Sequence, residues 1–214
     1  MRYRRCYPLL VTAVTAVAVI SCHSAVLAQA SAQQPAQATK PRPQAAQTAK
    51  PAQAPVTQAA VPAVGGVQPT LLGQYGDWGA YQATPGGKKV CFALAKPASS
   101  LTNPPNRPRD PSYMFVSSRP AEKVKEEISI IIGYGFKANS DATIDLGGTN
   151  FAMYTQNDGA WIKNAAEEPR LVESMRKGAD LVVKGTSARG TQSSDTYSLK
   201  GLAQALDRVG QECR

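Results

Sequence analysis

One spacing in this sequence resembles the start of a known catalytic motif. Ser174 and Lys177 form a Ser-x-x-Lys pattern, which places both side chains on one face of a helix. In serine acylases this pattern supplies a nucleophile and a lysine, but Ser-Asp-Asn and Lys-Thr-Gly segments accompany it. Neither segment occurs here. We interpret the pair as one turn of a surface helix, and we keep a hydrolase that uses Ser174 and Lys177 as an alternative hypothesis.

The sequence offers almost no histidine for catalysis or metal binding. The sequence contains a single histidine, His23, inside or beside an N-terminal segment that we expect to be cleaved off. The rest of the chain therefore lacks the residue that Ser-His-Asp and Cys-His mechanisms and histidine metal sites require. We predict no enzymatic activity, no cofactor and no metal.

Two other patterns have the wrong context for chemistry. Gly185 to Gly190 has the spacing of a phosphate-binding loop, but Thr191-Gln192 stands where lysine and a hydroxyl residue are required. Glu126-Glu127 lies in a predicted strand, where neighbours point to opposite faces. Glu167-Glu168 lies in the first turn of a predicted helix, where acids complement the helix dipole. Neither acidic pair forms a working pair of catalytic carboxylates.

The first 30 residues have the organisation of a secretory signal peptide. Three arginines precede an apolar run from Leu9 to Ile20, and small residues follow at Ala28 and Ala30. The run is well short of the roughly 20 residues that span a membrane. Residues 19–22 also resemble a bacterial lipobox, so lipidation at Cys22 and simple cleavage both stay open. We expect an exported protein that is periplasmic or associated with the outer membrane, with surface display as a further alternative.

The four cysteines divide between the signal region and the rest of the chain. Cys6 and Cys22 belong to the signal region, which leaves Cys91 and Cys213. In an exported chain these two most simply form a disulfide. The closed loop would hold more than 120 residues, and the chain-entropy model gives an upper figure of roughly 5 kcal/mol for it. Two buried free thiols are the alternative.

Residues 31–72 form a predicted linker, and residues 73–214 form the predicted domain. The linker is rich in Ala, Gln and Pro and contains no acidic or aromatic residue, which is typical of a disordered spacer. Signal and linker hold six of the 24 basic residues, so the domain has 18 basic and 15 acidic residues and a charge of +3. It has no basic patch interleaved with aromatic residues, so we predict no nucleic-acid partner.

The domain is predicted to be all-β, as an antiparallel β-sandwich of about eight strands with two short helices. Short alternating segments are separated by turns every 8 to 12 residues, which favours a sandwich over an α/β sheet. One strand, Val124 to Gly133, is apolar enough to be covered on both faces. The first helix follows Asn164 and ends at Gly178, and the second is capped by Ser198 and closed by Gly210.

Residues 97–111 are rich in Pro, Ser, Asn and Arg, and we predict that they form a long loop. Long loops on a rigid scaffold commonly bind partners, so Arg107, Arg109 and Asp110 are candidate binding residues. Five aromatic residues could also line a ligand surface, although core packing is the plainer interpretation. They are Trp78, Tyr81, Tyr113, Tyr154 and Trp161.

Several segments in fixed order resemble the invasion-associated locus B (IalB) family of alphaproteobacterial envelope proteins. The resemblance covers about residues 74 to 213. It rests on the export signal and on Tyr75-Gly76-Asp77-Trp78, Phe151-Ala152-Met153, Trp161-Ile162-Lys163, Met175-Arg176-Lys177-Gly178 and Tyr197-Ser198-Leu199-Lys200-Gly201-Leu202. It implies an immunoglobulin-like β-sandwich, an exported envelope location and, in pathogenic members, a link to entry into host cells. It implies no enzymatic activity and no catalytic residues.

Taken with the residue patterns, this resemblance predicts a non-enzymatic envelope module that binds an unidentified protein or envelope polymer. The contact is expected at exposed strand edges and at residues 97–111. Association with a membrane through a lipid anchor at Cys22 stays possible. The alternatives are a periplasmic hydrolase without histidine and a purely structural protein of the envelope.

Overall fold

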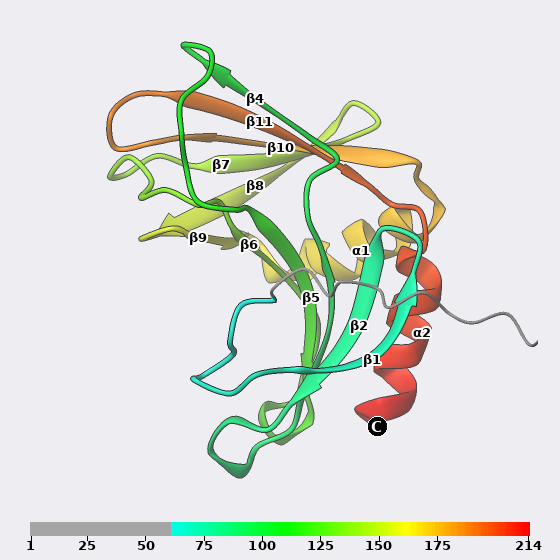
Figure 1. Ribbon diagram of the computed structural model, residues 1–214. Coiled ribbons are helices and arrows are strands. Elements are labelled where there is room, and N and C mark those ends of the chain that lie inside the picture. Colours follow the sequence, from blue (N-terminus) through cyan, green and yellow to red (C-terminus); the bar gives the residue numbers. More distant parts are fainter. Residues whose placement is uncertain (1–60) are drawn as a thin grey trace, which may run out of the picture. The chain divides into compact units, whose positions relative to one another are not determined.

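The computed structural model describes residues 61–214. The predicted signal peptide, the lipidation site at Cys22 and most of the predicted linker lie outside these residues. Eleven antiparallel strands form one continuous sheet in the order β1-β2-β3-β5-β6-β9-β8-β7-β10-β11-β4 (Figure 1). The strands are β1 Thr70–Tyr75, β2 Trp78–Ala83, β3 Val90–Ala95, β4 Ser99–Asn103, β5 Tyr113–Arg119, β6 Val124–Ile131, β7 Ala142–Leu146, β8 Thr149–Gln156, β9 Gly159–Ile162, β10 Asp180–Thr186 and β11 Gln192–Ser198.

Two α-helices, α1 (Glu168–Lys177) and α2 (Leu202–Glu212), complete the domain together with three short 3-10 turns. The prediction of an all-β, antiparallel fold with two short helices is confirmed. The structure has more strands than the predicted eight, because β1 and β4 add one strand at each edge of the sheet. Its terminal strands are β1 and β4, and β4 lies within residues that we predicted to be a loop.

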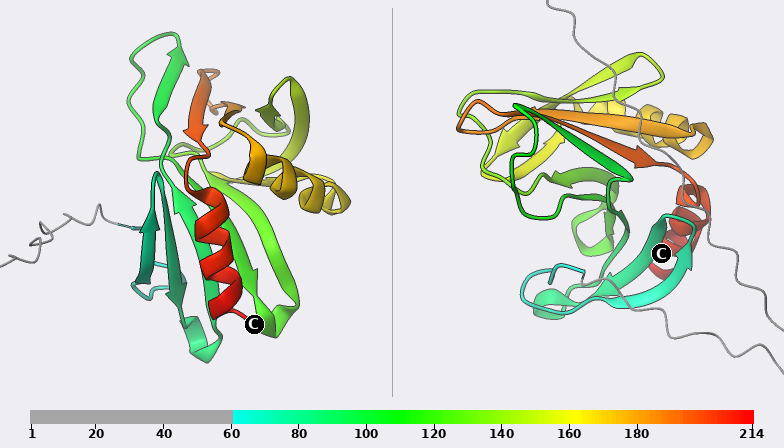
Figure 2. Two further views of the ribbon diagram at one scale, coloured as in Figure 1. Left: turned by 90° about the vertical axis from the view of Figure 1, so that its right-hand side faces the viewer. Right: turned by 45° about the horizontal axis from the view of Figure 1, so that its top comes forward.

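The two layers of the sandwich are the two halves of this single sheet (Figures 1 and 2). The half containing β1, β2, β3, β5 and β6 and the half containing β9, β8, β7, β10, β11 and β4 direct their inner side chains into one shared core. Both helices supply apolar side chains to this core, and α2 packs along β1, β2 and β3. Its largest fully buried side chains include Trp78, Tyr197, Phe151, Met114 and Ile128.

A second, smaller core lies on the outer face of the first half. Val90, Phe92, Leu94 and Phe115 are buried there, and Val61 and Val64 pack against them. Strand β3 is therefore buried on both faces. Strand β6, which we predicted to be covered on both faces, is fully buried on its inner face at Ile128 and Ile130, and its outer face is partly covered because Ile131 packs against the second core. The folded domain also begins before the predicted boundary at residue 73, since β1 starts at Thr70.

The hairpin of β8 and β9 follows the sequence pattern closely. Phe151 and Met153 point into the core, and their neighbours Ala152 and Tyr154 are exposed. Asn157 adopts a left-handed φ of 55° in the connecting turn, a conformation that asparagine tolerates better than most residues. The returning strand places Ala160 and Ile162 in the same core. This hairpin was predicted from alternation and turn chemistry, and the structure confirms it.

Helix α1 also forms where the sequence predicts it. The Asn164 side chain caps the 3-10 turn Ala165–Glu167 that leads into the helix, by accepting a hydrogen bond from the backbone N–H of Ala166 at 3.2 Å. Pro169 occupies the first turn of α1. Leu171, Val172 and Met175 form its buried stripe, and the helix ends before Gly178.

Helix α2 begins at a tight junction with the β1–β2 turn. The Trp78 indole donates to the carbonyl of Ser198 at 2.9 Å, and the backbone N–H of Asp77 donates to the carbonyl of Lys200 at 3.1 Å. Gly201 has a φ of 95°, and a Cβ atom there would lie 1.8 Å from the Tyr75 carbonyl oxygen. Only glycine allows this conformation and this approach.

Two predicted details of α2 are wrong. Ser198 does not cap the helix, because its hydroxyl accepts a hydrogen bond from the Lys200 N–H at 3.2 Å and Gly201 is the N-cap residue. Gly210 does not end the helix, which continues to Glu212. Packing of α2 against β2 and β3 overrides the low helix propensity of a single glycine.

The predicted disulfide between Cys91 and Cys213 is confirmed, and it joins β3 to the residue after α2. The bridge spans 122 residues of sequence. An ion pair between Lys89 and Glu212 lies beside it. The end of the last helix is therefore held covalently on the sheet that it covers.

Replacing Gly201 with alanine should destabilise the domain by about 3 kcal/mol or more, because it adds steric overlap with Tyr75 to an unfavourable φ. Urea unfolding of the variant and the wild type measures the difference. Gly190→Ala is the matched control, since Gly190 has a φ of 81° but open space around its Cβ position. It should lose only the conformational part, about 1 to 2 kcal/mol. Equal losses in the two variants would contradict the role of the close approach.

Removing the disulfide should reduce the stability of the domain by about 2 to 5 kcal/mol. The test is the double variant Cys91→Ala/Cys213→Ala, unfolded in urea alongside oxidised and reduced wild type. Reduced wild type should unfold near the variant and oxidised wild type well above both. If reductant left the wild-type midpoint unchanged, the bridge would not form in the exported protein.

Candidate binding site

The predicted Ser-x-x-Lys pair does not form a catalytic dyad. The Ser174 hydroxyl donates to the carbonyl of Arg170 at 2.9 Å, within its own helix. Lys177 pairs with Glu173 at 2.6 Å, and this interaction lowers the pKa of the Glu173 carboxyl. Both side chains lie on exposed turns of α1 and are occupied with other partners. The hydrolase alternative receives no geometric support from these two residues.

The adjacent glutamates have structural contacts. Arg176 of α1 binds Glu126 at 3.0 Å and Asp207 of α2 at 2.9 Å, so it joins both helices to β6. Glu127 pairs with Arg119 at 2.8 Å. The Glu168 carboxylate accepts the backbone N–H of Ile128 at 3.0 Å, and burial raises the pKa of this carboxyl. Glu126 and Glu168 fasten α1 to β6, and Glu127 joins β6 to β5. Each carboxylate is therefore engaged in a structural contact.

Residues 61–214 contain none of the other sites that the sequence patterns could suggest. Within this range, no group of three His, Cys, Asp or Glu side chains is placed to hold a metal ion. Gly185 to Gly190 joins β10 to β11 as a hairpin and opens no helix, as the sequence predicted. In the same part of the chain, no helix is both long and apolar enough to cross a bilayer.

The predicted loop of residues 97–111 contains a strand. Residues Ser99–Asn103 form β4, which pairs antiparallel with β11 from Asn103 opposite Gln192 to Ser99 opposite Thr196. The prediction of an unstructured loop is wrong for this part. Ser, Thr and Asn with one Leu give little strand signal, and β4 forms because β11 offers a complete ladder of partners. The segment that lacks a strand, residues 104–112, is called the anchored loop below.

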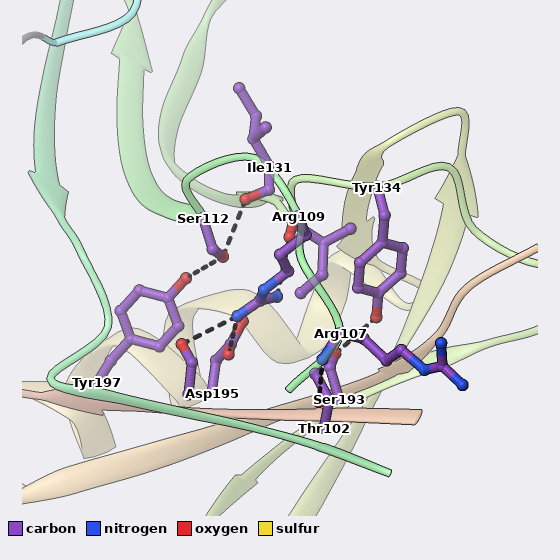
Figure 3. Close-up of polar contacts among 11 residues, drawn as sticks. Thr102, Arg107, Arg109, Ser112, Ile131, Tyr134, Ser193, Asp195 and Tyr197 are labelled. Atoms are coloured by element: carbon purple, nitrogen blue, oxygen red, sulfur yellow. Dashed lines mark hydrogen bonds and ion pairs between the residues drawn. The ribbon is translucent and has the colours of Figure 1, made fainter. Parts of the chain in front are cut away.

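Arg109 fixes the anchored loop to three separate parts of the domain (Figure 3). Its guanidinium forms an ion pair with Asp195 on β11, donates to Ser100 on β4 at 2.9 Å, and donates to the carbonyl of Ile132 after β6 at 2.9 Å. It also lies over the ring of Tyr134, 5.9 Å from the ring centre. Because Arg109 binds β4, β11 and the end of β6, it ties the loop to the far edge of the second half of the sheet and to the last strand of the first half.

Hydroxyl groups surround this ion pair. The hydroxyls of Ser112 and Tyr197 are 2.7 Å apart, and Ser112 donates to the carbonyl of Ile131 at 3.0 Å. The hydroxyls of Tyr134 and Ser193 are 2.6 Å apart. Burial raises the pKa of both tyrosines, so both stay neutral hydroxyls at physiological pH. Figure 3 shows these side chains converging between the loop and β11.

The Arg109 side chain is therefore structural and is not a free binding residue. Only 11% of it is exposed, and Asp195 is fully buried, with its second carboxylate oxygen lacking any hydrogen-bond partner among the described residues. Arg107 and Asp110 are exposed, and within the described part of the chain neither side chain has an ion pair. Of the three predicted binding residues, two remain available to a partner and the third positions them.

The predicted aromatic residues fall into two groups. Trp78 is fully buried, so the core interpretation holds for it. Tyr81 stacks on Phe92 in the second core. Tyr154 and Trp161 stack on the outer face with ring centres 5.5 Å apart, and Tyr154 is 45% exposed.

Leu101 was not among the predicted site residues, although its side chain is 70% exposed on β4. It lies opposite Ser194 on β11, which lies opposite Lys184 on β10, which in turn lies opposite Thr143 on β7. The last three residues line a pocket of about 250 Å³. An isolated leucine in a polar segment does not indicate a binding residue. Only the pairing of β4 with β11 places Leu101 at the end of the cross-strand row of Ser194, Lys184 and Thr143.

The fold defines a disulfide-bonded, all-β sandwich protein with two helices on its inner face. A model of the family described as "Invasion associated locus B (IalB) protein" matches residues 81–210, more than half of the chain. The chain therefore belongs to the IalB family, and the resemblance inferred from its motifs is confirmed. Among solved structures, it is similar to invasion associated protein b from Bartonella henselae, with 16% identity, a TM-score of 0.47, and coverage of 67% of this chain and 97% of that chain. A comparison with curated proteins finds no match.

Replacing Arg109 with alanine should cost about 3 to 5 kcal/mol of stability, because it leaves Asp195 buried without a counter-charge. Thermal and urea unfolding check this directly. Arg107→Ala, two residues away on the exposed side of the loop, is the matched control and should change stability by less than about 0.5 kcal/mol. A small effect at Arg109 would mean that the ion pair does not anchor the loop.

Ser174 should not react with acylating reagents. Incubation of the folded protein with a fluorophosphonate probe, followed by mass spectrometry, should leave Ser174 unmodified, because Lys177 is paired with Glu173 and does not contact the hydroxyl. A Ser174→Ala variant gives the background. Labelling that disappears in this variant would revive the hydrolase hypothesis.

Proposed function

We propose that this IalB-family chain is an exported, non-enzymatic binding module of the cell envelope, and that its anchored loop contacts a protein or polymer partner. The observation that carries the proposal is the buried ion pair between Arg109 and Asp195 beneath an exposed loop. Export is proposed from the N-terminal signal pattern, which lies outside the described residues.

The energetics of the ion pair support a binding role for the loop. Removing two charges from water costs several kcal/mol per ion, and a well-packed apolar pair would stabilise a domain at least as well. Arg109 instead fixes the position of the loop, since its hydrogen bonds connect the loop to β4, to β11 and to the end of β6. A loop held in one conformation loses less entropy when a partner binds. The pair therefore favours a preformed contact surface.

The side chains that this anchoring leaves outside are suited to recognition. Arg107 and Asp110 carry opposite charges on the solvent side of the loop. Exposed charges at the rim of a contact select partners and accelerate association more than they raise affinity. The loop thus has a rigid support and an accessible, specific surface.

No described group of side chains favours catalysis. The candidate nucleophile Ser174 and the paired glutamates are engaged in helix and sheet contacts. The family name associates IalB proteins with invasion. For this chain we propose that any role in host-cell entry follows from binding and not from a reaction.

A photo-crosslinking amino acid placed at Pro105, on the exposed part of the anchored loop, should capture a discrete partner when the full chain is expressed in its bacterium. The adduct should weaken at least severalfold in a second-site Arg107→Glu or Asp110→Lys variant, because these changes reverse the charges that a partner meets. Immunoblotting of the irradiated envelope fraction measures the adduct.

The control places the same crosslinker at Lys177, an exposed position on α1. It should give no adduct of that size. An adduct from Lys177 that equals the one from Pro105, or one from Pro105 that both charge variants leave unchanged, would exclude the anchored loop as the contact.

A further inference from the structure

The two edges of the sheet differ in how they are protected. At one edge, β1 has a β-bulge between Leu71 and Gly73, and α2 packs against the strand. At the other edge, β4 pairs with β11 in unbroken register and contains neither a proline nor a charged residue. Proteins usually protect an edge with a bulge, a proline or a charge, because unpaired N–H and C=O groups recruit another strand. Strand β4 has none of these protections.

The side chains of β4 also leave an apolar contact open. Leu101 is 70% exposed, the largest exposure among the exposed large hydrophobic residues in the described part of the chain. Leu101 lies in one cross-strand row with Ser194 of β11 and Lys184 of β10. An added strand would place a side chain next to Leu101, which the described residues leave exposed.

A positive charge lies beside this edge. The backbone N–H of Arg107 donates to the Thr102 hydroxyl of β4 at 3.2 Å, so the anchored loop runs close to the strand. The Arg107 guanidinium is exposed and has no acidic partner among the residues that the structure describes. An acidic side chain on an added strand would supply one.

We propose that β4 accepts an extended segment of a partner protein as a twelfth strand, antiparallel to β4, with an apolar side chain against Leu101 and an acidic side chain facing Arg107. This inference rests on the proposed binding function and names its partner class. Main-chain hydrogen bonds to the free edge supply affinity, and the two side-chain contacts supply selectivity, as in other cases of strand addition. Arg109 holds β4 in place by donating a hydrogen bond to the Ser100 hydroxyl.

A second copy of this chain is a poorer occupant. Stable protein interfaces use about 20 to 30 residues on each side, whereas β4 offers five. Pairing of β4 with itself would cover a ladder only about 17 Å long. A peptide segment has no such requirement, because short strands bind sheet edges in many recognition domains.

The test is selection of peptides from a phage-displayed library of random dodecapeptides on the full mature chain. Enriched peptides should combine an apolar and an acidic residue. In fluorescence anisotropy, Leu101→Lys and Arg107→Glu should each raise the Kd of an enriched peptide at least tenfold. Tyr154→Ala, on the outer face of β8, is the control and should leave the Kd unchanged. Circular dichroism and unfolding midpoints must match wild type for all three variants.

Backbone pairing has its own signature. N-methylation of alternate amides in the peptide should abolish binding for one set, the set that faces β4, and spare the other set. Failure to enrich any peptide overturns the inference, and so does binding that Leu101→Lys and Arg107→Glu both leave unchanged. If the binding is instead lost in Tyr154→Ala, the chain is still a binding module but β4 is not its site. Sedimentation that shows a dimer dissociated by Leu101→Lys would assign the edge to a second copy and would also overturn the proposal.

Discussion

The ion pair between Arg109 and Asp195 fixes the segment between β3 and β5, which pairs with a strand far from it in sequence. The chain leaves the first half of the sheet after β3, forms β4 at the far edge of the second half, and returns to form β5 beside β3. Nothing in the hydrogen-bonding of β3 and β5 requires this excursion. Arg109 fixes its return, because one guanidinium binds β4, β11 and the end of β6. The position of the loop and of the free edge both depend on this contact.

The rest of the domain is stabilised by contacts that lie away from the anchored loop and β4. The shared core joins the two halves of the sheet. Helix α2 is held at one end by the close approaches at Gly201 and at Gly76, where a Cβ atom would lie 2.6 Å from the Lys200 carbonyl oxygen, and at the other end by the disulfide. Arg176 connects α1, α2 and β6. Residues 99–110 thus combine mostly exposed polar residues with the exposed Leu101 on a rigid scaffold, an arrangement typical of loops and edges that bind.

The motifs from which we inferred the family resemblance lie in the core and at a junction between elements. Tyr75 to Trp78 meets Ser198 to Gly201 in one junction, through the indole of Trp78 and two close glycine contacts. Phe151 and Met153 lie in the core. Leu101 and Arg107, the two side chains that we propose for partner contact, lie outside these motifs. These motifs therefore mark the fold, and the contact that we propose lies elsewhere.

Short-range patterns were enough to predict much of this protein. Alternation and turn residues predicted the hairpin of β8 and β9, and capping residues with an apolar stripe predicted α1, because each depends on neighbours a few positions apart. The pairing of Cys91 with Cys213 followed from there being only two cysteines beyond the signal region.

Only the tertiary structure decided what depends on distant partners. Strand β4 exists because β11 pairs with it, and α2 passes Gly210 because the sheet supports it. Arg107 and Arg109 are indistinguishable in sequence, two arginines between prolines in one polar segment. One is exposed and the other is buried on Asp195, 86 residues away, because burial of a charge is determined by what the fold brings beside it.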